Sequence, residues 1–218
     1  TKTTLSNGLR VVTVPMPQVE SVTVLVLVEA GSRYETPEIN GLSHFLEHMT
    51  FKGTIRRPSK FKLISLIDGI GCFYNAFTSK ENTCFYIKAP KEHINLVLDV
   101  LSDAIINSVY DPDEIKKEKG VIIEEINMYE DEPSSRVWEV LEKLLYKDSP
   151  LGARTIGDKE TVSSFTRAQL KDYVKKTYKT GSVVVGLAGN ISDKVPSLVE
   201  EYFSPLDPGN ASHFRKAS

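Results

Sequence analysis

Two histidines lie in one five-residue segment, His44-Phe45-Leu46-Glu47-His48, which holds half of the four histidines in the chain. On a helix, side chains four residues apart share one face, so both imidazoles can reach a single Zn²⁺. Glu47 follows His44 by three residues, which directs its carboxylate near the same face and towards a water held by the metal. The segment therefore predicts two zinc ligands, His44 and His48, with Glu47 beside them as general base.

The alternative is that the two histidines are surface or capping residues beside a chance glutamate, because a catalytic zinc site also needs a third protein ligand. The helix predicted from 111 to about 129 offers Glu118, Glu124 and Glu125. At 3.6 residues per turn, Glu118 and Glu125 share a face, whereas Glu124 points about 120° away from Glu118. The alternative is a solvated acidic face paired with nearby lysines. Spacing alone does not choose between Glu124 and Glu125.

The elements that must position these residues are both strands and helices. Runs of β-branched and aromatic residues predict strands at 9–14, 21–29, 72–77, 83–89 and 183–188. The strands at 72–77 and 83–89 are predicted to form a hairpin. Apolar residues at helical spacing predict helices at 40–50, 58–68, 91–107, 111–129, 134–146, 166–178 and 195–203. Strands and helices do not alternate regularly, which predicts the α+β class with a mixed, largely antiparallel sheet packed with helices.

The composition is that of an ordinary globular protein, with 40% hydrophobic residues, 26% charged residues and a formal net charge of -2. This balance argues against a nucleic-acid partner, and no apolar run reaches the roughly 18 residues of a membrane span. Residues 1–203 are predicted to form one domain. The segment 204–218 is rich in Pro, Gly and Ser and predicts a linker towards a second domain. The compartment is unknown from the sequence; a soluble, cytoplasmic protein is the working expectation.

Several ordered segments resemble a known family. The segment 41–54 (GLSHFLEHMTFKGT) is similar to the zinc motif of the inverzincin peptidases, which include pitrilysin, insulysin and the mitochondrial processing peptidase. The processing-peptidase-like branch is the most similar. Further matches follow in the same order at 75–83, 118–126, 150–157 and 187–190. The resemblance therefore covers the chain from about Leu5 to about Asn190.

The resemblance implies a set of site residues. In the family pattern the third ligand follows a first glutamate by seven residues, which makes Glu125 the ligand and Glu118 an acid that supports the site. Zn²⁺ is the implied cofactor, and Glu47 takes the proton of the attacking water. A peptide substrate is expected to lie as an added strand along Asn75, Ala76 and Phe77, for which the alternative is an ordinary edge strand.

The resemblance also implies a second homologous domain, and this sequence is expected to hold one domain and a linker. We therefore expect a zinc-dependent endopeptidase domain that hydrolyses peptides or unfolded segments. It would work with a second homologous domain, a partner subunit or a second copy in a dimer. The alternatives are a non-catalytic subunit and a zinc-binding fragment that is inactive without the second domain.

Overall fold

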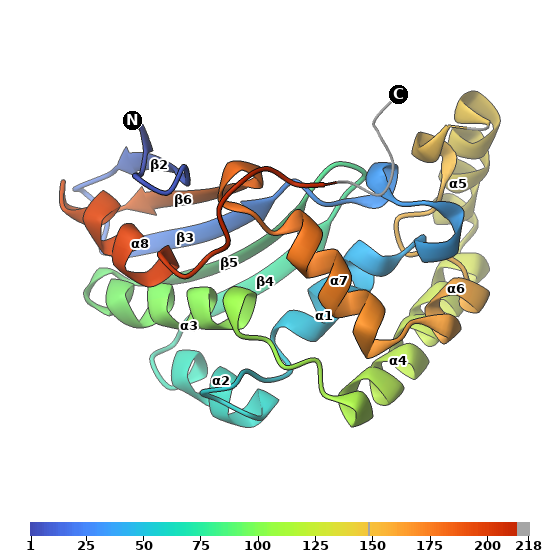
Figure 1. Cartoon of the computed structure of the whole chain (residues 1–218), viewed down its shortest axis with the longest axis horizontal. Coiled ribbons are helices and arrows are strands. Elements are labelled where there is room, and N and C mark those ends of the chain that lie inside the picture. Colours follow the sequence, from blue (N-terminus) through green and yellow to red (C-terminus); the bar gives the residue numbers. More distant parts are fainter. Residues whose placement is uncertain (148, 213–218) are drawn as a thin grey trace.

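The structure is a computed structural model that describes residues 1–147 and 149–212. A six-stranded sheet with the order β1-β2-β6-β3-β5-β4 forms its back, and helices pack against it (Figure 1). Strands β2 and β6 are parallel, and every other neighbouring pair of described strands is antiparallel. The predicted α+β class with a mixed, largely antiparallel sheet is confirmed.

The strands are β1 (Lys2–Thr4), β2 (Arg10–Pro15), β3 (Ser21–Val28), β4 (Phe73–Thr78), β5 (Thr83–Pro90) and β6 (Val183–Gly189). The helices are α1 (Leu42–Thr50), α2 (Lys60–Asp68), α3 (Ile94–Ile106), α4 (Pro112–Asp131), α5 (Pro133–Tyr146), α6 (Lys159–Ser164), α7 (Arg167–Thr177) and α8 (Val195–Phe203). All predicted strands and helices are present with small shifts at their ends. The short elements β1 and α6 were not predicted.

Strand β3 shows how the sheet acquires a covered face. Its residues Val22, Val24, Val26 and Val28 are fully buried, and the residues between them are half-buried. Because side chains alternate along a strand, the four valines all point to one face. Helix α3 packs on β3 and β5 from that side, and α1 packs on β4 and β5. The helix with the two histidines is therefore anchored at the β4 end of the sheet.

The start of α1 is fixed by a buried carboxylate from another segment. Gly41 precedes the helix in the left-handed region with a φ of 94°, and a Cβ there would lie 2.6 Å from the carbonyl oxygen of Ile156. The Glu35 carboxylate accepts hydrogen bonds from the N–H groups of Gly41 at 2.8 Å and Ser43 at 2.7 Å. Glu35 thus supplies the cap that glycine has no side chain to provide.

Helix α4 begins at the signals read from the sequence. The Asp111 side chain accepts hydrogen bonds from the N–H groups of Asp113 and Glu114, and Pro112 is the first helical residue. The helix then runs for 20 residues and packs against α1 and α6. This crossing brings its glutamates to the histidines of α1.

The described part of the predicted linker lies against the domain. The backbone carbonyls of Asp207 and Gly209 accept hydrogen bonds from the N–H groups of Thr180 and Gly181, and Leu206 is buried. Residues 213–218 of the predicted linker lie outside the described residues. Among the helices that the structure describes, none has the length and apolar character needed to cross a bilayer.

Candidate metal centre

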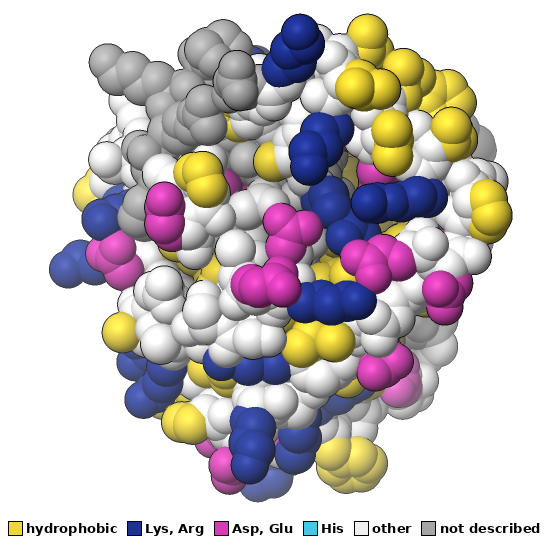
Figure 2. Space-filling model, turned by 90° about the vertical axis from the view of Figure 1, so that its right-hand side faces the viewer, with side chains coloured by type: hydrophobic (Ala, Val, Ile, Leu, Met, Phe, Trp, Pro, Cys, Tyr) yellow, Lys and Arg dark blue, Asp and Glu magenta, His cyan; other side chains and the backbone are white. Residues whose placement is uncertain are grey.

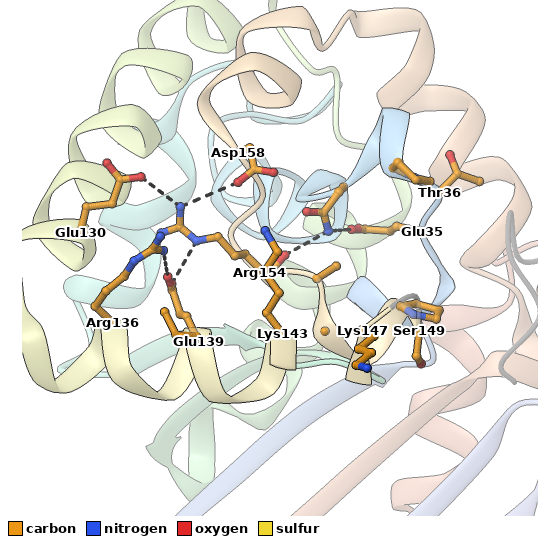
Figure 3. A pocket seen from close by; sticks show the side chains of 16 residues that line it. Glu35, Thr36, Glu130, Arg136, Glu139, Lys143, Lys147, Ser149, Arg154 and Asp158 are labelled. Atoms are coloured by element: carbon orange, nitrogen blue, oxygen red, sulfur yellow. Dashed lines mark hydrogen bonds and ion pairs between the residues drawn. The ribbon is translucent and has the colours of Figure 1, made fainter. Parts of the chain in front are cut away.

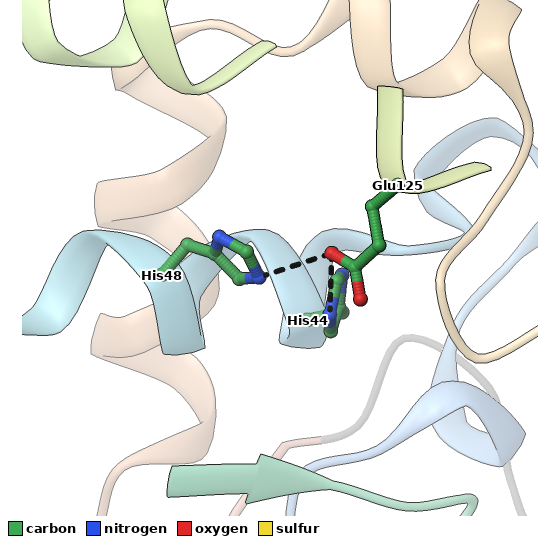
Figure 4. A group of neighbouring side chains, drawn as sticks. All are labelled: His44, His48 and Glu125. Atoms are coloured by element: carbon green, nitrogen blue, oxygen red, sulfur yellow. Dashed lines mark ion pairs between the residues drawn. The ribbon is translucent and has the colours of Figure 1, made fainter. Parts of the chain in front are cut away.

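The two histidines of α1 point away from the core and towards α4. The opposite side of α1 is buried in the core through Leu42, Phe45, Leu46 and Met49. Nε2 of His44 lies 3.8 Å from Oε2 of Glu125, and Nε2 of His48 lies 3.5 Å from the same oxygen (Figure 4). The three residues thus meet at one point between the two helices.

The ligand atoms of His44, His48 and Glu125 all lie within 4.8 Å of one another. Among the described residues, these three form the cluster of histidine, cysteine and acidic side chains that could hold a metal ion. Zinc ligands lie about 2 Å from the metal in a tetrahedron, so neighbouring ligand atoms are about 3.3 Å apart. The separations of the two Nε2 atoms from Oε2 of Glu125, 3.8 and 3.5 Å, are close to that value. Two imidazoles and one carboxylate are also the donor types that a catalytic zinc takes, with a fourth position left open. The residues present therefore fit a zinc ion.

The Nδ1 atom of His48, the ring nitrogen that faces away from Glu125, is held by Glu118. Nδ1 of His48 lies 2.9 Å from Oε1 of Glu118, and Nζ of Lys52 lies 2.6 Å from Oε2 of the same buried carboxylate. Burial alone would raise the pKa of Glu118, but the hydrogen bonds from His48 and Lys52 outweigh it and lower the pKa. An ionised Glu118 accepts the Nδ1–H of His48 and leaves the Nε2 lone pair free for a metal.

His44 differs from His48 in this respect. Its Nδ1 atom is buried and has no hydrogen-bond partner among the described residues. Burial, together with the neighbouring His48, lowers the pKa of His44 to about 3. The imidazole is therefore neutral near pH 7, which is the form that binds metals.

Glu47 lies next to the cluster and is held from the sheet. Thr78, at the end of β4, donates its hydroxyl to Oε2 of Glu47 at 2.5 Å. Burial raises the pKa of Glu47, while the Thr78 hydrogen bond acts in the opposite direction. A carboxylate with a raised pKa and one fixed oxygen has the properties of a general base.

The structure separates the two glutamates that spacing left as rivals. Glu124 is exposed and accepts a hydrogen bond from Asn127, on the side of α4 that faces away from the histidines. Glu125, one residue later, reaches both of them. Geometry therefore brings Glu125 to the cluster and keeps Glu124 out of it.

A cleft of about 330 Å³ joins the cluster to strand β4. Glu47, His48 and Glu118 line it together with Asn75 and Ala76. Strand β4 is the last strand of the sheet, so one side of its backbone has no neighbouring strand. Phe77 also lies on this strand but is outside the lining of the cleft, and it is about half exposed.

Two contacts of the site were not assigned from the sequence. Lys52 follows His48 by four residues, which on a helix that continues would have suggested a neighbour of the same face. Thr78 lies at the end of the predicted hairpin strand, and no local pattern indicates that it reaches Glu47. Both contacts depend on how separate elements pack.

A second cavity, of about 510 Å³, lies between α5 and the segment 35–40 (Figure 3). Arg154 crosses it and pairs with Glu139 at 3.0 Å and with Glu130 at 3.2 Å. None of the residues of the metal cluster lines this cavity. It is larger than the cleft beside β4, but the charged groups of Arg154, Glu130 and Glu139 are already paired with one another.

An inverted His-x-x-Glu-His motif on one helix, faced by a glutamate from a second helix in an α+β domain, is the arrangement of the inverzincin metallopeptidases. The sequence comparison agrees. Residues 10–159 match the model of the insulinase family, peptidase family M16, and the chain belongs to this family. Residues 164–218 match a second model, described as the peptidase M16 inactive domain.

Relatives with known sequences include the "Uncharacterized zinc protease YmxG" of Bacillus subtilis, 45% identical over 98% of this chain and 52% of its own length. The β subunit of the mitochondrial-processing peptidase of Saccharomyces cerevisiae is 40% identical over 91% of this chain and 43% of its own length. The chain thus spans about half the length of these relatives.

Solved structures share the fold. The periplasmic protease PqqL of Escherichia coli superposes with a TM-score of 0.90 at 26% identity, over all of this chain and 25% of its own. A protease of Helicobacter pylori superposes with a TM-score of 0.88 at 23% identity, over all of this chain and 53% of its own.

Proposed function

We propose that this chain is the zinc-carrying half of an endopeptidase that hydrolyses peptide bonds in peptides or unfolded segments. The observation that carries the proposal is the meeting of His44, His48 and Glu125 beside Glu47. The names of the relatives, which are described as zinc proteases and a processing-peptidase subunit, support the same function. Each residue role below belongs to this proposal.

His44, His48 and Glu125 would hold the zinc ion. When bound, zinc lowers the pKa of a water molecule and polarises the carbonyl of the bond to be cleaved. Glu47 would take the proton from the attacking water and pass it to the leaving amine. Thr78 would fix one oxygen of Glu47, which leaves the other free for the proton. Glu118 would orient His48 through its Nδ1–H.

The free edge of β4 would bind the substrate. An extended peptide can pair with the backbone of Asn75, Ala76 and Phe77 as an added strand. A peptide in that position would pass through the cleft that Glu47 and His48 also line. The main-chain hydrogen bonds would hold peptides of many sequences, as expected for an enzyme that acts on unfolded segments.

A second homologous half or a partner subunit would complete the enzyme. The relatives are about twice as long as the matched region, and one of them is named as a subunit. This observation also favours a second candidate, a zinc-binding domain that has no turnover by itself. The two candidates differ in activity and agree in zinc binding.

Zinc content of matched variants tests the ligand set. The 218-residue chain should hold one zinc per molecule by elemental analysis after reconstitution and removal of free metal. Glu125→Gln should lose most of it, because a neutral amide is a poor zinc ligand. Glu124→Gln, which changes the adjacent residue in the same way, should keep it. Wild-type protein that takes up no zinc would overturn the proposal.

Activity separates the two candidates. A quenched peptide should be cleaved by the full-length protein that contains this region, and cleavage should stop when zinc is removed. If the 218-residue chain binds zinc but cleaves only after its second half is added, the chain by itself is a zinc-binding fragment. A full-length, zinc-loaded protein without cleavage of any unfolded substrate would contradict the endopeptidase function.

A further inference from the structure

Helix α5 turns an apolar face towards solvent. This apolar face of α5 consists of Val137, Trp138, Leu141, Leu144 and Leu145, which recur at helical spacing and form one stripe. Trp138, Leu144 and Leu145 are 66%, 65% and 67% exposed, and the helix has no buried residue. Hydrophobic side chains gather at the upper right of the face seen in Figure 2, over the side of the molecule that carries α5.

The charged side of α5 faces its own domain. Glu139 pairs with Arg154 at 3.0 Å (Figure 3), which attaches the helix to the segment after it. Glu142 pairs with Lys80 at 2.8 Å, which attaches it to the β4–β5 turn. A surface helix of a self-sufficient domain has the opposite orientation, with its apolar stripe on the core and its charges in water. The orientation of α5 therefore leaves an apolar surface on its outer side that is suited to an apolar partner.

The apolar face of α5 is also too continuous to be incidental. Single exposed hydrophobic residues are common on proteins, and Ile55 and Phe61 are examples here. The stripe from Val137 to Leu145 is about 12 Å long and exposes five large side chains next to one another. Contiguous apolar surface of this kind marks interfaces, above all those between permanent partners.

We propose that the apolar face of α5 is the surface on which the second, homologous half of the protein packs. The relative YmxG aligns with nearly all of this chain and extends over about as many residues again. The structurally similar protease of Helicobacter pylori likewise has about half of its chain outside the match. A partner of this kind is always present at a one-to-one ratio, so the apolar face stays covered and causes no aggregation.

Hydroxyl-radical footprinting read by mass spectrometry tests this directly. The oxidation rates of Trp138, Leu144 and Leu145 are measured in the full-length protein and in the 218-residue chain, with Phe61 as internal reference. We expect Trp138 to react about fivefold or more slowly in the full-length protein, because interface cores exclude water. Phe61, 80% exposed on α2, should react equally in both. The readout needs neither zinc nor activity, so its failure is distinct from failure of the proposed function.

Equal oxidation of Trp138 in the two proteins would overturn the inference. Protection that disappears when the full-length protein is diluted, or that arises with concentration in the 218-residue chain alone, would also overturn it, because the occupant would then be a second copy.

A pair of matched variants adds a second measurement. Leu144→Asp in the full-length protein should raise Trp138 oxidation towards the rate in the 218-residue chain and lower the thermal midpoint. Ile55→Asp, which places the same charge at another exposed aliphatic side chain, should do neither. A Leu144→Asp protein that keeps both Trp138 protection and the wild-type midpoint would contradict the proposed packing.

Discussion

Helices α1 and α5 are both amphipathic, but they are oriented in opposite ways. Helix α1 buries its apolar residues in the core of its own domain and directs its ionisable residues to a cleft. Helix α5 directs its ionisable residues to its own domain and its apolar residues to solvent. The sequence pattern alone is similar in the two helices, so amphipathicity does not say which side faces inwards.

The two orientations suit the two helices to different roles. The close packing of the apolar side of α1 fixes the rotation of the helix, which places His44 and His48 at 3.8 and 3.5 Å from Glu125. The ion pairs of α5 locate the helix without using its apolar side. A site for chemistry needs the first arrangement, and a surface for a partner needs the second.

The strongest test of this comparison concerns the polar side of α1. Glu47→Gln should lower kcat/KM of the full-length protein about 10²- to 10⁴-fold, because the amide cannot take a proton from water. Zinc content should not change, since Glu47 is outside the proposed ligand set. A peptide assay with elemental analysis of the same samples measures both. Activity within a few-fold of wild type would remove Glu47 from its proposed role.

The next test compares the apolar sides of the two helices. Phe45→Ala in α1 should lower the free energy of unfolding of the zinc-free 218-residue chain by about 3–5 kcal/mol, because a buried ring is lost and a cavity remains. Leu144→Ala in α5 should change it by less than about 0.5 kcal/mol, because that side chain is already in water. Urea denaturation measures both. Similar losses for the two variants would show that α5 is packed in the isolated chain.

A smaller effect is expected behind the metal cluster. Glu118→Gln should weaken zinc binding about 10- to 100-fold, because His48 loses a charged acceptor for its Nδ1–H. A competition titration against a chelator of known affinity measures it. Glu114→Gln, which removes a partly exposed acid at the start of the same helix, is the matched control and should bind zinc like wild type. Unchanged affinity in Glu118→Gln would mean that His48 needs no partner.

The smallest expected effect is a pH dependence at the start of α1. Burial raises the pKa of Glu35, against the hydrogen bonds from Ser43, Gly41 and Asn40. A carboxyl whose pKa is higher in the folded state than the unfolded value of about 4.3 holds its proton more tightly when folded. Its contribution to stability is therefore complete below that unfolded value and is lost as the pH rises through the folded pKa.

Urea midpoints of wild type and Glu35→Gln across a pH series measure this contribution as a difference. The wild-type midpoint should fall relative to the variant as the pH rises above about 4.3. A difference that is constant with pH would mean that Glu35 has the same pKa in both states.

Sequence patterns predicted most of the fold, because the elements that carry the core are long enough to show a period. Strand β3 and helix α4 are of this kind, and the Asp111 cap fixes the start of α4. Strand β1 and helix α6 have three and six residues, too few for a period to emerge. Their positions depend on pairing with β2 and packing against α4.

By itself the sequence determined the chemistry that is available: two histidines and a glutamate at helical spacing, and a second helix rich in glutamates. The tertiary structure decided which of those glutamates faces the histidines, that Lys52 and Thr78 support the site, and that α5 turns its apolar side outwards. The physical reason is the sequence separation over which each kind of interaction acts. Helical periodicity acts over a few residues, whereas the contacts of Glu118 with His48 and of Thr78 with Glu47 join segments 70 and 31 residues apart.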